Sequence, residues 1–148
     1  MNTARRIMLG AALAGSLVAL GACSSMMPGN TVKIGATLYA AAEVPPNDSK
    51  GKGTMEGTFN KDTRLLKWNV TYEGLTGPAM AAHFHGPAMA GSNAGVVVQF
   101  GPPVTSPIVG EATITPEQAA DLLAGKWYVN VHTAQNKGGE IRGQVVIR

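Results

Sequence analysis

Short segments in which apolar and polar residues alternate fill most of this chain and favour β-strands. In the clearest of them Leu66, Trp68, Val70 and Tyr72 share one face, and polar residues share the other. Because side chains on a strand point to opposite faces in turn, this period of two predicts a sheet with one face on the core and one in water. The same pattern puts Trp127 in the core.

The other alternating segments are separated by turns rich in glycine, proline and asparagine. Strands are expected over residues 32–39, 53–59, 66–73, 81–85, 96–100, 108–114, 127–133 and 140–147. Thr115, Pro116 and Glu117 predict the start of one short helix near 116–124, and Gly125 predicts its end. About seven or eight short strands with a single helix predict an all-β fold, an antiparallel sandwich.

The N-terminus has the form of a bacterial signal peptide. Arg5 and Arg6 precede an apolar run that is shorter than the roughly 20 residues needed to cross a bilayer. The run ends in Leu-Gly-Ala-Cys at residues 20–23, which resembles a lipobox. That resemblance implies that Cys23 carries acyl chains such as palmitate and becomes the first residue of the mature chain.

These features divide the chain into three parts. Residues 1–22 are the expected signal peptide, 23–31 the lipidated cysteine and tether, and 32–148 a single β domain. The expected partner is a membrane, reached through the lipid anchor. By resemblance to enterobacterial sorting, Ser24 favours the outer membrane, with the domain in the periplasm or at the cell surface.

Charge and cysteine content exclude several classes of function. The chain has 12 Lys and Arg against 9 Asp and Glu, and removal of Arg5 and Arg6 would leave ten basic and nine acidic side chains. Without a basic cluster, no nucleic-acid partner is expected. With Cys23 as the only cysteine, the domain has no disulfide and no thiolate metal site. Nothing resembles an activated nucleophile, so hydrolase chemistry is not expected and a non-enzymatic role is favoured.

Three segments, in this order, resemble the CHRD domain, a module named after chordin and found in many bacterial secreted proteins. They are ATL at 36–38 with EVPP at 43–46, AAHFHG at 81–86 with GVVV at 95–98, and YVNVHT at 128–133 with GEIRG at 139–143. The resemblance covers about residues 32 to 148. It implies an immunoglobulin-like, Greek-key β-sandwich or barrel, and it defines the fold better than the function.

All three histidines lie inside these segments. His83 and His85 are two apart, so they share one face of their strand, while His132 lies on another strand. Such a pair with a third imidazole from a neighbouring strand is typical of copper and zinc sites on β-sandwiches, with one coordination position left open. Copper is favoured over zinc. Met80 and Met89 flank the pair and could add thioether ligands, which would favour Cu(I).

The alternative for these histidines is structural, because a histidine on a half-buried strand often only donates to a backbone carbonyl. Asn130 and Glu140 are candidate outer partners that would orient His132. Glu140 and Arg142 are also an i, i+2 pair of the kind that usually forms an exposed ion pair. Glu43 is expected to cap a bend.

The primary hypothesis is therefore an envelope lipoprotein whose domain binds a transition metal through His83, His85 and His132. The first alternative is a structural or interaction module that binds protein or polysaccharide. The second is copper-dependent activity like that of superoxide dismutase, although the chain lacks that family's disulfide cysteines and has too few histidines for a two-metal site.

Overall fold

The computed structural model describes residues 30–148, so the expected signal peptide and most of the tether lie outside the described residues. Within this part of the chain, no helix is both long and apolar enough to cross a bilayer. The elements in chain order are β1 (Thr31–Tyr39), the 3-10 helix η1 (Ala40–Ala42), β2 (Lys52–Asn60), β3 (Leu65–Glu73), β4 (Ala79–His85), β5 (Val96–Gln99), β6 (Ile108–Thr113), α1 (Pro116–Leu123), β7 (Tyr128–Thr133), β8 (Ile141–Gln144) and β9 (Val146–Ile147).

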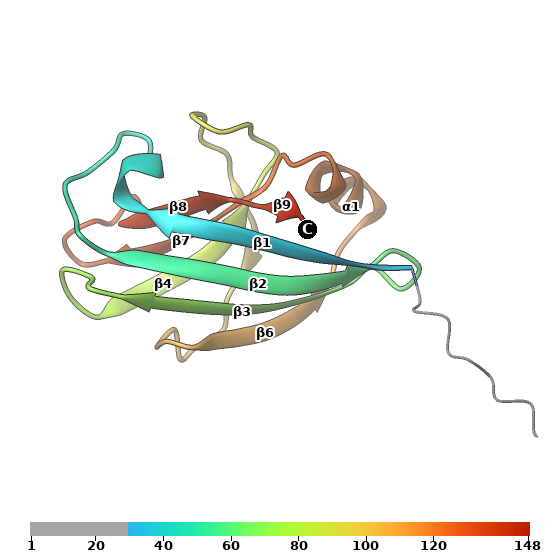
Figure 1. Cartoon of the computed structure of the whole chain (residues 1–148), viewed down its shortest axis with the longest axis horizontal. Helices are drawn as coiled ribbons and strands as arrows, with labels where there is room; N and C mark the ends of the chain where they lie inside the picture. The colour runs from blue at the N-terminus through green and yellow to red at the C-terminus, as the bar shows by residue number, and fades with distance from the viewer. Residues whose placement is uncertain (1–29) are drawn as a thin grey trace, which may run out of the picture.

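The strands form one antiparallel sheet that curves into a nearly closed barrel (Figure 1). Its order is β5-β4-β7-β8-β1-β2-β3-β6, and β9 pairs with β1. β5 and β6 are the two edges. The predicted all-β, antiparallel sandwich or barrel is confirmed. Because β7 runs between β4 and β8, side chains from these three strands can meet on one surface.

The alternation predicted for β3 is confirmed by the burial of its side chains. Leu66, Trp68 and Val70 lie in the core, and Lys67 and Asn69 between them are exposed. Burial of large apolar side chains of this kind supplies roughly 1.5–3 kcal/mol each. The sheet therefore closes around an apolar interior, and its polar chemistry is confined to the outside.

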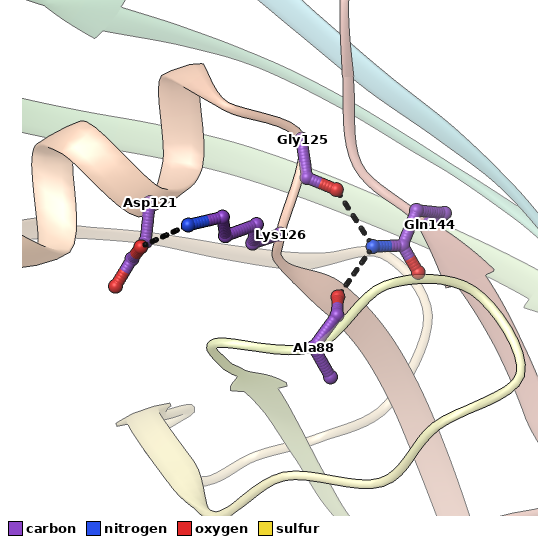
Figure 2. Close-up of polar contacts among 5 residues, drawn as sticks. All are labelled: Ala88, Asp121, Gly125, Lys126 and Gln144. Carbon is purple, nitrogen blue, oxygen red and sulfur yellow. Dashed lines mark hydrogen bonds and ion pairs between the residues drawn. The ribbon is translucent and has the colours of Figure 1, made fainter.

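Helix α1 has the boundaries that the sequence predicts. The Thr115 side chain accepts a hydrogen bond from the Gln118 backbone, and the Gln118 side chain accepts one from the Thr115 backbone. Gly125 ends the helix with φ at 71°. The amide of Gln144 then donates to the carbonyl oxygens of Gly125, at 2.8 Å, and of Ala88, at 2.9 Å (Figure 2). β8 is thus tied to the helix end and to the loop after β4.

The C-terminal segment differs from the prediction of one strand over 140–147. Two strands form there, which makes nine in the described residues rather than seven or eight. β8 pairs with β7, and β9 pairs with β1. Val145 between them is fully buried, and its N–H donates to the carbonyl oxygen of Trp127 at 2.9 Å. The strand is interrupted at Val145, because this side chain enters the core where the backbone crosses from β7 to pair with β1.

The outer face of β7 is covered rather than solvated. Tyr128 and Asn130 point away from the core and are nevertheless buried. The cover consists of residues 40–51 and 86–95, and the two segments are joined where the Asn93 amide donates to the carbonyl oxygen of Val44 at 2.8 Å. This covered face carries the histidines.

Candidate metal centre

Two neighbouring strands bring the three histidines to one surface. His83 and His85 lie on β4, His132 lies on β7, and these strands pair with Asn130 opposite His83. The three imidazoles lie on one face, because residues two apart on a strand point the same way and Asn130, two before His132, is paired with His83. The ring centroids of His83 and His132 are 4.8 Å apart.

One nitrogen from each ring takes part in a compact group. These three nitrogens all lie within 4.8 Å of one another. The closest pair is Nδ1 of His83 and Nε2 of His132, at 3.0 Å. Three imidazole nitrogens at such spacing are a donor set suited to zinc or copper.

Backbone carbonyls fix the orientation of two of the rings. Nδ1 of His132 lies 3.0 Å from the carbonyl oxygen of Lys137, and Nδ1 of His85 lies 3.0 Å from that of Ala94. Since a carbonyl only accepts, a proton on each Nδ1 completes these two bonds and leaves each Nε2 with a lone pair. Nε2 of His85 is buried and has no hydrogen-bond partner. This is how metal-binding histidines are commonly held.

The surroundings keep the rings neutral. Burial, together with the neighbouring His132 and His85, lowers the pKa of His83 from 6.5 to about 4. Burial also lowers the pKa of His85 and of His132, against the opposing effect of their hydrogen bonds to Ala94 and Lys137. Neutral imidazole is the form that binds metal.

Comparison with known families bears on the whole domain. A family model described as the CHRD domain matches residues 34–145. The chain belongs to the CHRD-domain family. Neither the curated proteins nor the solved structures give a match. The resemblance inferred from the three segments is therefore confirmed, and the histidines of the CHRD domain lie inside the matched region.

A wall of buried polar side chains closes the histidine site of this CHRD domain. Its members are Glu43, Asn130 and Arg142, which are only 5%, 2% and 1% exposed. Burial raises the pKa of Glu43 to about 7, although the Arg142 charge and the Asn130 amide favour its ionised form. Asn130 lies as predicted beside His132, with Oδ1 2.9 Å from Nε2 of the ring.

Arg142 joins the wall to the loop after β4. Its guanidinium lies 3.3 Å from the centre of the Tyr128 ring and donates to Asn93 Oδ1 at 2.9 Å and to the carbonyl oxygen of Ser92 at 2.6 Å. An exposed ion pair with Glu140 was expected, but both side chains are buried and the two have separate partners. The loops that cover β7 and β8 remove this face from water.

Glu140 has other partners than His132. Its carboxylate accepts from Ser49 Oγ at 2.6 Å, from the Thr76 backbone and hydroxyl at 2.7 Å each, and from Thr133 Oγ1 at 2.5 Å. Burial opposes its ionisation, but these bonds outweigh burial and lower the pKa to about 2. Glu140 therefore holds two loops, those of Ser49 and Thr76, against the end of β7 at Thr133. The sequence offered Glu140 as a partner of His132, but the carbonyl oxygen of Lys137 takes that place.

Sequence reasoning missed Glu43 as part of the site. The backbone of Glu43 does end η1, with its N–H 3.1 Å from the carbonyl oxygen of Ala40. The side chain, however, turns inward. The available signal was that Glu43 and Arg142 lie inside the same family segments as the histidines.

Proposed function

We propose that this CHRD domain is a metal-binding module of the cell envelope that holds copper at His83, His85 and His132. The convergence of three imidazole nitrogens within 4.8 Å of one another carries the proposal. A bound cation would also satisfy the buried, unpartnered Nε2 of His85. A buried polar atom without a partner is costly, by about 1–3 kcal/mol, unless something binds it.

The general affinity order of divalent ions favours copper over zinc at this donor set, because Cu(II) binds imidazole nitrogens more tightly than Zn(II) does. The 3.0 Å between His83 Nδ1 and His132 Nε2 is close to the roughly 2.9–3.3 Å that separates two nitrogen ligands of either ion.

The thioethers of Met80 and Met89 do not contribute to this argument. The two residues are 67% and 62% exposed, and exposed methionines on loops and strand ends need no functional explanation. The imidazoles alone therefore define the proposed donor set.

Titration calorimetry on the full chain, purified in detergent and stripped of metal with a chelator, tests the function. We expect saturable binding of one Cu(II) per chain, tighter than that of Zn(II), and a rise in melting temperature with added copper. The triple variant His83→Gln, His85→Gln, His132→Gln should lose both effects and remain folded. Asn69→Ala, on an exposed site of β3, is the matched control. The function would be refuted if the wild type bound neither ion with a dissociation constant below about 10 μM, which corresponds to roughly 7 kcal/mol of binding free energy.

Attachment to a membrane through Cys23 is part of this function and is supported by the lipobox-like sequence at 20–23. β1 begins at Thr31, so about seven residues follow Cys23 before the domain, a length of chain that can reach at most roughly 25 Å. Several acyl chains on one cysteine hold a protein firmly. Cys23→Ser should abolish incorporation of labelled palmitate and release the cleaved protein from membranes. Cleaved protein that stays in the membrane fraction would contradict the anchor.

A further inference from the structure

The side chain of Asn130 lies against Nε2 of His132, one of the nitrogens proposed to bind the metal. It precedes His132 by two residues on β7 and therefore points to the same face. Its Oδ1 is 2.9 Å from Nε2 of His132, which is itself 3.0 Å from Nδ1 of His83. The side chain thus lies beside His132, on the face of β4 and β7 that carries the three histidines.

The two nitrogens of His132 pose a conflict that a cation resolves. Nδ1 faces the carbonyl oxygen of Lys137, and Nε2 faces Oδ1 of Asn130, so both face acceptors. A neutral imidazole has one N–H and can satisfy only one of them. A metal ion between Nε2 and Oδ1 would turn the second, repulsive contact into two bonds. At 2.9 Å, Nε2 and Oδ1 are also close enough for both to bind one ion.

Glu43 determines which end of the Asn130 amide faces the histidines. Oε1 of Glu43 and Nδ2 of Asn130 both lie close to the position that a Cβ on Gly139 would occupy. Oε1 is buried and lacks a hydrogen-bond partner, and the amide favours the ionised carboxylate. An N–H group beside the carboxylate has that effect. With Nδ2 turned toward Glu43, Oδ1 is turned toward His83 and His132.

We infer that Oδ1 of Asn130 is a fourth ligand of the metal, and that Glu43 is a positioning residue that holds the Asn130 amide in the ligating orientation. The inference rests on the proposed three-histidine centre. It makes the donor set three nitrogens and one oxygen, with the oxygen supplied by the same strand as His132. Amide oxygens are weaker donors than imidazoles, so Asn130 adjusts affinity and geometry rather than creating the site.

The test uses the full chain loaded with Cu(II) and measures affinity by competition with a chelator and coordination by electron paramagnetic resonance. Asn130→Leu should weaken Cu(II) binding about tenfold or more and change the copper hyperfine splitting, because water replaces the amide oxygen. Asn130→Asp, which keeps an oxygen at the site, should restore affinity and give a third, distinct spectrum. A purely structural role for Asn130 would not produce that rescue with an altered spectrum.

Glu43 offers a matched pair of variants. Glu43→Gln keeps an oxygen beside Nδ2 of Asn130, so the Cu(II) affinity and spectrum should stay close to those of the wild type. Glu43→Leu removes the acceptor and should reproduce the spectrum of Asn130→Leu.

The outcomes separate the two proposals. If the wild type binds no copper, the metal centre itself fails, and this inference fails with it. If the wild type binds copper, and the Cu(II) affinity of Asn130→Leu is within twofold of it with an unchanged spectrum, Asn130 is not a ligand. The three-histidine centre would then stand. Should Asn130→Leu not fold, an Asn130→Asp spectrum identical to that of the wild type would overturn the inference.

Discussion

The imidazole of His85 lies parallel to the ring of Tyr128, with 4.7 Å between centroids and 1° between planes. The guanidinium of Arg142 lies 3.3 Å from the centre of the same ring. His85 is on β4 and Arg142 on β8, and β7 runs between them, so the two groups reach Tyr128 from opposite sides. The stack fixes the plane of His85, and the positive charge disfavours its protonation.

The first prediction concerns this stack. Tyr128→Phe keeps the ring that contacts His85 and Arg142 and should leave Cu(II) affinity within about threefold, losing about 1 kcal/mol of stability with the hydroxyl's bonds to Ala94. Tyr128→Leu removes the ring and should weaken Cu(II) binding by about tenfold or more. Chelator competition on the two variants measures the difference. Equal affinities would show that the stack does not orient His85.

The second prediction compares two adjacent glycines. Gly139 has φ at 132°, and a Cβ there would collide with the side chains of Glu43 and Asn130. Gly139→Ala should therefore cost about 1–3 kcal/mol of unfolding free energy and also weaken Cu(II) binding. At Gly138 a Cβ would meet nothing within 4 Å, so Gly138→Ala should change stability by less than about 0.5 kcal/mol. Urea unfolding of both variants checks this, and similar losses would contradict it.

Much of the fold follows from local pattern, whereas the wall of the site does not. The period of two identifies which face of β4 carries His83 and His85, and Thr115 with Pro116 and Glu117 indicates the start of α1. Neither pattern indicates which loop covers a face. Glu43 meets Asn130 only because residues 40–51 fold over β7, and Arg142 is buried by a loop some 50 residues earlier in the chain. Such contacts depend on tertiary packing, so alternation alone suggested an exposed ion pair.

The third prediction follows from the buried carboxylate of Glu140. Its pKa is about 2 in the folded protein against an ordinary 4.5, so its stabilising contribution is fully present above pH 4.5 and is lost as the pH falls toward 2. Glu140→Gln should lower the unfolding free energy at pH 7 by about 2 kcal/mol, because donors from two loops and from the end of β7 lose a charged acceptor. It should also flatten the fall in stability between pH 4.5 and 2. Chemical unfolding across this range measures both effects. If the unfolding free energy of the variant falls between pH 4.5 and 2 as steeply as that of the wild type, the ionised Glu140 does not stabilise the fold in this way.

The last prediction is the pH dependence set by the histidines. In the folded, metal-free protein the pKa of His83 is about 4, below its ordinary 6.5. The unfolded chain therefore takes up a proton between pH 6.5 and 4 that the folded protein does not. Stability supplied by the neutral ring is complete above pH 6.5 and is lost as the pH falls through 4.

The lowered pKa of His83 should also determine the pH at which the metal is released. Protons compete with Cu(II) for His83 only near its folded pKa of about 4, so binding should persist well below pH 6.5, where an unperturbed imidazole would already release the ion. Calorimetric titrations from pH 7 to 4.5 measure this, with an exposed imidazole peptide as the reference. His83→Gln should remove part of the stability loss between pH 6.5 and 4 in the metal-free protein. Two results together would show that the surroundings do not hold the ring neutral. They are a Cu(II) affinity that is lost already near pH 6.5, and an unfolding free energy that depends on pH in His83→Gln as it does in the wild type.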